Sequence, residues 1–234
     1  KWYGVALSNP FVMDALKTSL TVAFIAAFVA TVFGTMAAVA LQGIKGPVRR
    51  VFDLLIYVAV MIPGIVIGIA TLIGLVTVFD QLNPLIAAFW PVGATPPKLH
   101  MGMGSLVAAH TMFLMALVII IVRARLAGMD RALTEASSDL YASPFGTFRQ
   151  VTLPLIFPAV MAGFLLSFTF SFDDFIIAFF VAGSETTLPI YVFSSIRRGV
   201  TPEINAIGSM VLAVSLIMLI SAQILLRRGN GKAK

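Results

Sequence analysis

Residues 135–154 read Glu-Ala-Ser-Ser-Asp-Leu-Tyr-Ala-Ser-Pro-Phe-Gly-Thr-Phe-Arg-Gln-Val-Thr-Leu-Pro, a polar segment in a chain that is otherwise strongly apolar. Long hydrophobic stretches lie on both sides of it. A polar segment between membrane spans has to lie in water or against a partner protein, because the hydrocarbon core offers no hydrogen-bond partners. The alternation of this polar segment with the apolar stretches therefore decides the fold, because it separates membrane spans from a segment outside the bilayer.

The composition is that of a polytopic membrane protein. The 234 residues are 59% hydrophobic and 11% charged, with a mean hydropathy of +1.02, whereas soluble domains are about 25% charged. There is no cysteine and there are two histidines, so we predict neither disulfides nor a metal site. The net charge of +6 comes from short scattered clusters, which membrane topology explains better than nucleic-acid binding.

Five apolar stretches are long enough to cross a bilayer. The sequence predicts one all-α transmembrane domain over residues 1–234, with spans over residues 16–41, 54–78, 105–122, 155–182 and 204–226 and a polar loop over residues 129–154. Residues 1–15 are predicted to be interfacial. Pro63 should bend the second span, and residues 80–104, rich in proline and glycine, should form a long outer connection.

The distribution of Lys and Arg predicts the orientation. Eleven lie on one predicted side: Lys45, Arg49, Arg50, Arg123, Arg125, Arg131, Arg149, Arg227, Arg228, Lys232 and Lys234. Five lie on the other: Lys1, Lys17, Lys98, Arg197 and Arg198. The side with more basic residues is expected to be cytoplasmic. The C-terminus is then cytoplasmic and the N-terminus outside, which leads us to expect a further span before Lys1.

The polar segment is predicted to contain two short helices. Asp130 can cap the first, whose apolar positions Leu133, Ala136 and Leu140 fall on one stripe. Ser143 and Pro144 suit the N-cap and first turn of the second helix.

Such a helix could lie on the lipid surface or dock into a protein groove. Lipid-surface helices usually carry many Lys and Arg residues, whereas this one carries Glu135 and Asp139 beside Arg131. The composition favours docking.

The spacing from Glu135-Ala136-Ser137 to Val151, Leu153 and Pro154 resembles the EAA loop of ABC-importer permeases. Ser137 stands for the second Ala of that motif, Tyr141 for its Gly and Val151 for its Ile. With Tyr at the glycine position, we expect the tight turn to shift toward Ser143-Pro144. The resemblance implies a coupling helix that docks on an ATPase subunit through these residues: Glu135, Ala136, Ser137, Leu140, Tyr141, Leu153 and Pro154.

Four further stretches are similar to permease subunits of bacterial spermidine and putrescine importers: 1–4, 167–175, 187–189 and 202–206. This resemblance implies a type I ABC importer permease in the bacterial inner membrane, with six spans, of which the first is absent here. It also implies alternating access, a second permease subunit, two ATPase subunits that hold ATP and Mg, and an external solute-binding protein. No cofactor is expected in this chain.

The substrate pathway is predicted from acidic residues in a span, because a mid-bilayer carboxylate costs about 3 kcal/mol and tends to be functional. Asp174 shares a helical face with Ser171 and Ser167, while Asp173 points about 100° away. The alternative is that both acids reach headgroups or water at the outer end of the span. His110 is interpreted as a packed polar residue bonded to a neighbouring helix, with a proton carrier as the alternative.

The sequence is compatible with other functions. Arg197-Arg198 with Glu203 could contact a solute-delivering protein or form a solvated loop. The sequence has neither a phosphate-binding loop nor a recognisable catalytic motif, so we do not expect an enzyme. The alternatives are an importer permease for another small solute, a self-sufficient carrier or channel, and a membrane scaffold. The exact solute, the identity of the partner permease, and which aspartate faces the pathway do not follow from the sequence.

Overall fold

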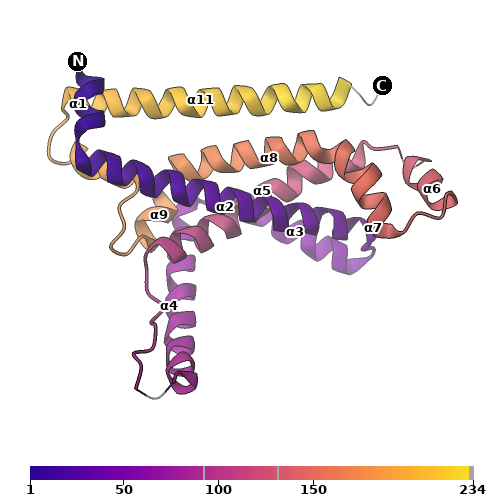
Figure 1. The fold of residues 1–234 in the computed structure, drawn as a ribbon, viewed down its shortest axis with the longest axis horizontal. Coiled ribbons are helices and arrows are strands. Elements are labelled where there is room, and N and C mark those ends of the chain that lie inside the picture. Colours follow the sequence, from indigo (N-terminus) through magenta and orange to yellow (C-terminus); the bar gives the residue numbers. More distant parts are fainter. Residues whose placement is uncertain (92, 131, 232–234) are drawn as a thin grey trace.

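The computed structural model describes residues 1–91, 93–130 and 132–231, with side chains up to residue 227. Every regular element in this described part is a helix, which confirms the predicted all-α class (Figure 1). Arg131, Lys232 and Lys234 lie outside the described residues, as does the side chain of Arg228. Their place in the charge distribution stays a prediction.

The helices follow one another along the chain, with short interruptions. They are α1 (Trp2–Ser8), α2 (Pro10–Gly43), α3 (Pro47–Met61), α4 (Gly64–Phe89), α5 (Met103–Ala127), α6 (Ala132–Asp139), α7 (Pro144–Thr147), the π-helical turn η1 (Phe148–Thr152), α8 (Leu153–Asp173), α9 (Ile176–Val181), α10 (Leu188–Ile196) and α11 (Pro202–Gly231).

Five helical stretches of the described chain are long and apolar enough to cross a membrane. They are Pro10–Gly43, Gly64–Phe89, Met103–Ala127, Pro144–Asp173 and Pro202–Arg227. The predicted multi-pass class is confirmed, although several bounds differ from those expected.

The second span was predicted over residues 54–78, and this prediction was wrong in its bounds. The chain leaves the helical conformation at Ile62 (ψ 132°) and Pro63 (ψ 135°), so α3 ends at Met61 and α4 begins at Gly64. A residue before proline is driven out of the α region by the proline ring. Pro63 therefore separates two helices where a bend in one helix was expected.

The fourth span, predicted over residues 155–182, is also interrupted. Asp174 is extended (φ −71°, ψ 121°) and separates α8 from α9. At its other end, α8 continues backward through η1 and α7, so the helical path begins at Pro144. The interruption has no proline or glycine to mark it in the sequence.

Two predicted non-spanning segments contain helices. Residues 80–104 were predicted to be a loop, yet α4 continues through Pro84 to Phe89. Residues 1–15 contain α1 and the start of α2, where the Asn9 side chain caps α2 by accepting a hydrogen bond from the Phe11 N–H at 3.1 Å. The α10 helix was not predicted.

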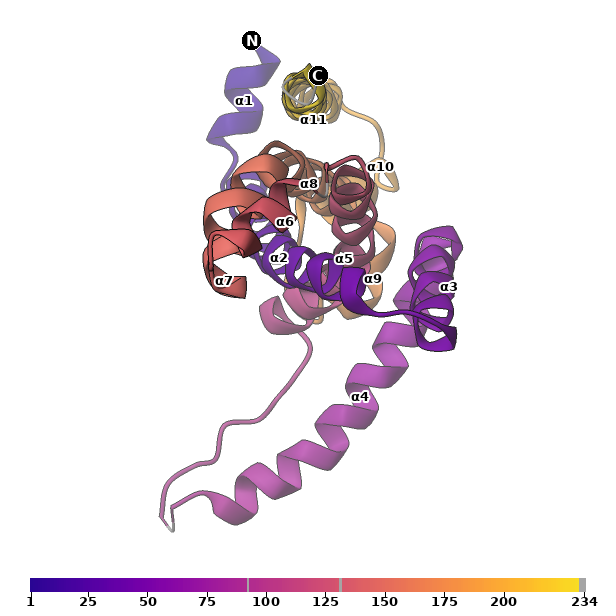
Figure 2. The same cartoon turned by 90° about the vertical axis from the view of Figure 1, so that its right-hand side faces the viewer.

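The core is a bundle of α2, α5 and α8, with α11 running beside α8 (Figures 1 and 2). Small residues allow the close approach: a Cβ added at Gly34 of α2 would lie 2.9 Å from the Val118 side chain of α5, and Gly163 of α8 faces the same valine. Buried alanines line α2 along this contact. Close packing of small residues is the usual basis of helix association in membranes.

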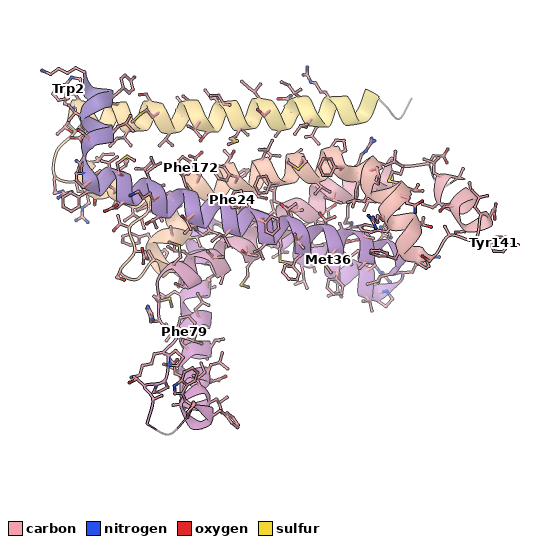
Figure 3. All side chains as sticks on the ribbon, in the orientation of Figure 1. Trp2, Phe24, Met36, Phe79, Tyr141 and Phe172 are labelled. Atoms are coloured by element: carbon pink, nitrogen blue, oxygen red, sulfur yellow. The ribbon has the colours of Figure 1, made fainter. Side chains whose placement is uncertain are left out.

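The α4 helix leaves this bundle crosswise (Figures 1 and 2). Its first turns pack on α9 through Gly68, against Phe180 and Ile177, but among its described residues only Gly68 is buried. Large apolar side chains are also exposed along the outer face of α2, among them Phe24 and Met36 (Figure 3). These faces require lipid or another protein to cover them.

Candidate functional site

The first predicted site, the polar segment, forms α6 and α7 at one end of the bundle (Figure 1). Asp130 caps α6 as predicted, since its carboxylate accepts a hydrogen bond from the Ala132 N–H at 3.0 Å. Leu133, Glu135 and Ala136 are exposed. The predicted stripe therefore faces away from the rest of the chain.

Tyr141 makes the tight turn that the glycine of the EAA pattern would make. Its φ is +60°, and the Ala142 N–H bonds to the Ser137 carbonyl (3.1 Å) while the Tyr141 N–H bonds to that of Ser138 (2.9 Å). These two bonds define a Schellman motif at the C-terminus of a helix. The expected shift of the turn toward Ser143-Pro144 was wrong.

The side chains beside this turn are the most exposed apolar groups of the segment. Leu140 is 81% exposed and Tyr141 97%, and the Tyr141 side chain extends outward from the end of the molecule (Figure 3). An apolar pair held this far into solvent is a candidate docking surface.

The second helix begins where the sequence predicted. The Ser143 hydroxyl accepts a hydrogen bond from the Gly146 N–H at 3.1 Å, and Pro144 occupies the first turn. The Ser137 and Thr147 hydroxyls lie 2.9 Å apart and join the two helices. Leu153, by contrast, packs against the buried core cluster that includes Val122 and Leu126, so it anchors the segment instead of enlarging the exposed face. Pro154 lies in the first turn of α8.

Charged contacts connect this end of the molecule to the bundle. Asp53 of α3 accepts a hydrogen bond from Arg123 of α5 and lies 3.8 Å from Arg49. Arg125 donates from Nε to the Leu155 carbonyl at 3.1 Å. A cavity of about 460 Å³, lined among others by Lys45 and Glu135, lies between these helix ends and α6.

The second predicted site is a polar pocket inside the bundle. His110 of α5 lies with Nδ1 2.7 Å from the Ser171 Oγ and with Nε2 3.5 Å from Asp174 Oδ2. The His110 side chain is 2% exposed and that of Asp174 is 22% exposed. All three residues line a cavity of about 160 Å³, whose wall also includes Ile62 and Gly64. Both interrupted helices thus meet at one pocket.

Contacts along α5 locate this pocket within the helix bundle. Ser105 Oγ donates to the Val181 carbonyl at 2.6 Å, while Arg125 reaches the start of α8, so α5 runs antiparallel to α8 and α9. His110 is five residues, or about 8 Å, inside Ser105. Asp174 therefore lies within the bundle, with α9 continuing beyond it, and not at the outer end of the helix pair.

The four predicted pathway residues are not brought together as a single stripe. Ser171 and Asp174 line the pocket, although Asp174 is in the extended backbone and not on the helical face as predicted. Asp173 accepts hydrogen bonds from Ser215 of α11 at 2.8 and 3.0 Å, so it fastens α11 to α8. Ser167 is fully buried, and its hydroxyl has no hydrogen-bond partner in the described chain.

His110 bonds a neighbouring helix as interpreted, but the sequence did not associate it with Asp174. The only available signal was a polar ring in an apolar span. The outer residue Glu203 accepts a hydrogen bond from Asn9 Nδ2 at 2.9 Å, and Arg198 lies 3.3 Å from Ser195 Oγ, so these groups contribute to local structure at that end.

Residues 11–230 match the family model described as binding-protein-dependent transport system inner membrane component. The spermidine/putrescine transport system permease protein PotC of Shigella flexneri is 36% identical over 99% of this chain and 82% of the relative. The putrescine transport system permease protein PotI of Escherichia coli K12 is 37% identical over 97% and 77%.

Two other similarities bear on solute and fold. The sulfate transport system permease protein CysT of Salmonella typhimurium is 31% identical over 97% of this chain and 80% of the relative. The structure of a bacterial ABC transporter involved in the import of the acidic polysaccharide alginate aligns with a TM-score of 0.74 at 13% identity, covering 97% of this chain and 82% of that one.

Proposed function

Since this chain belongs to the family of binding-protein-dependent transport system inner membrane components and is a permease subunit of an ABC importer, we propose that it moves a small cationic solute, a polyamine such as spermidine or putrescine, by alternating access. The two polyamine permeases described above support this choice of solute. A self-sufficient carrier, channel or scaffold is not retained, because family membership assigns the chain to a larger importer.

The observation that carries the proposal is the Asp174 carboxylate in the wall of the pocket between the two helix interruptions. A carboxylate within a span attracts a cation, and interrupted helices are where membrane transporters bind their solutes. The main alternative is another small solute, since a sulfate permease is also related. The negative charge of Asp174 argues against an oxyanion such as sulfate, because like charges repel in a medium of low dielectric constant.

The exposed face of α6 supports the second part of the proposed mechanism, the coupling of transport to ATP hydrolysis. Leu133, Ala136, Leu140 and Tyr141, with Glu135, form the surface on which an ATPase subunit docks. Two such subunits bind ATP and Mg and hydrolyse the ATP. The chain itself supplies no catalytic group; it transmits their motion to the spans.

The exposed apolar faces support further partners. A second homologous permease subunit covers α4, lipid surrounds the outer helices, and an external solute-binding protein delivers the solute at the end formed by α1, α10 and the start of α11. In this orientation the chain is multi-pass in the bacterial inner membrane with its C-terminus in the cytoplasm. No nucleic acid takes part.

The proposed solute is tested by replacing Asp174 with Asn in the complete importer, reconstituted in proteoliposomes with its binding protein. We expect the amount of putrescine transported per ATP hydrolysed to fall about tenfold, because the charged partner of the ammonium group is lost. A wild-type ratio, or equally good transport of sulfate by the unmodified importer, would contradict the proposal.

A further inference from the structure

His110 is the one deeply buried ring of the pocket whose role the proposed function leaves open. Its side chain is 2% exposed, and its Nε2 has no hydrogen-bond partner within the described residues at normal bonding distance. An unsatisfied buried polar atom costs about 1–3 kcal/mol. A nitrogen kept at that cost, 3.5 Å from the carboxylate of Asp174, requires an explanation.

Nε2 is the ring nitrogen that faces the carboxylate. The hydrogen bond between Nδ1 and Ser171 indicates whether Nε2 carries a hydrogen and can donate it. An uncharged imidazole has one donor and one acceptor nitrogen. Thr169, two residues earlier in α8, donates its hydroxyl to the Leu165 carbonyl at 2.9 Å. In the described chain the Ser171 hydroxyl has no such backbone acceptor and contacts His110 Nδ1 at 2.7 Å.

Two arrangements are then possible. If Ser171 donates to Nδ1, the Nε2–H group points at Asp174, and each polar group has a complementary neighbour. If Nδ1 donates to Ser171, the serine hydrogen is left without an acceptor, and a lone pair on Nε2 faces the carboxylate. The first arrangement satisfies more buried groups and avoids placing two acceptors face to face.

The backbone at Asp174 explains why a positioning group is useful there. Asp174 is in extended backbone between α8 and α9, and its Oδ2 accepts a hydrogen bond from the Ala178 N–H at 2.9 Å. This backbone contact restrains the carboxylate from the start of α9. His110, held by Ser171 two residues before the end of α8, approaches the same carboxylate oxygen from α5.

We propose that His110 is a positioning residue: held by Ser171, it directs the Asp174 carboxylate into the 160 Å³ pocket, where the carboxylate receives a primary ammonium group of the solute. This inference rests on the proposed function and adds the Ser171–His110–Asp174 chain to it. The gain is preorganisation, because a carboxylate already aimed at the pocket loses less conformational freedom when the solute binds.

The test uses amides that replace one ring nitrogen each. Gln at position 110 can place its amide near the Nε2 position and donate to Asp174, whereas Asn reaches only the Nδ1 position. The complete importer is reconstituted in proteoliposomes with putrescine-loaded binding protein, and putrescine transported per ATP hydrolysed is measured. This ratio does not depend on how much complex assembles, so a loss of assembly alone leaves it unchanged.

We expect His110→Asn to lower the ratio about tenfold, the factor equivalent to about 1.4 kcal/mol, and His110→Gln to remain within about twofold of the wild type. Combined with Asp174→Asn, His110→Asn should have no further effect, because its partner is already gone. His100→Asn is the matched control; His100 is exposed, outside the pocket and bonded to Lys98.

Several results would overturn the inference. A wild-type ratio for His110→Asn beside a lowered one for Asp174→Asn would refute the role of His110 alone. Equal defects in the Asn and Gln variants, or effects of His110→Asn and Asp174→Asn that add, would do the same. A wild-type ratio for Asp174→Asn would refute the proposed function as well. If His110→Asn fails to assemble, Ser171→Ala replaces it, with an expected loss of about twofold, as for His110→Gln, which also lacks the contact with Ser171; an unchanged ratio for Ser171→Ala would refute the role of Ser171 in holding the ring.

Discussion

Tyr141 has a left-handed backbone that glycine adopts more readily, at φ +60°. For a residue with a Cβ this conformation costs about 1 kcal/mol. Tyr141→Gly should therefore be more stable than Tyr141→Ala by about 1 kcal/mol, since both lose the ring but only alanine keeps the strain. Thermal unfolding of the two variants measures the difference; equal stability would show that the turn relaxes without cost.

If the ring itself contacts the ATPase, both variants should lose ATPase binding to a similar extent.

A substitution at Gly34 tests the packing between α2 and α5. A Cβ there would meet the Cβ of Val118 at 2.9 Å and the Met115 carbonyl at 3.2 Å, and neither atom is the end of a flexible side chain. Gly34→Ala should destabilise the bundle by about 1–3 kcal/mol through overpacking. Gly74→Ala is the control, because its Cβ would enter open space and alanine favours a helix. A melting temperature for Gly34→Ala at or above that of the control would contradict the packing.

Single residues also show how far sequence reasoning reaches. The caps at Asp130 and Ser143 were predicted correctly because a cap depends on neighbours within a few residues. The turn at Tyr141 was misplaced because the surrounding Schellman hydrogen bonds outweigh the intrinsic preference against φ above zero. The approach of His110 to Asp174 brings together residues far apart in the sequence, and no sequence pattern links them.

At the scale of elements, the contact between α3 and α5 depends on Asp53, which neutralises Arg123 and lies near Arg49. Asp53→Asn leaves two partly buried guanidinium groups without their carboxylate. We expect a loss of about 1–2 kcal/mol, more than a fully exposed pair would give. The measurement is the melting temperature against that of Asp139→Asn, which removes a carboxylate from exposed α6. Equal values would mean that the ion pair contributes nothing.

Helix interruptions were predictable only where proline marks them. Pro63 was expected to bend its span. It instead breaks the span completely, because α3 ends before it. The break at Asp174 follows an apolar run with no breaking residue, and it is stabilised by contacts with α5 and α9 that only the folded chain supplies. The crosswise direction of α4 could not be predicted either, because hydropathy indicates the length of a helix and not its direction (Figure 2).

At the scale of the whole molecule, the α6 surface and the outer ends of α5 and α9 lie at opposite ends of the bundle (Figure 1). The chain has no cysteine, so a single introduced thiol reports its own location. Ser138 on α6 and Ser184 after α9 are both exposed, and Ser→Cys is a small change at each. We expect a membrane-impermeant thiol reagent to label Ser184→Cys in intact spheroplasts, and Ser138→Cys only after permeabilisation, because the excess of Lys and Arg at the α6 end keeps that end in the cytoplasm. Labelling of both thiols in intact spheroplasts, or the reverse order, would refute the proposed orientation and with it the docking of a cytoplasmic ATPase on α6. The unsubstituted chain, which has no thiol, supplies the background for both measurements.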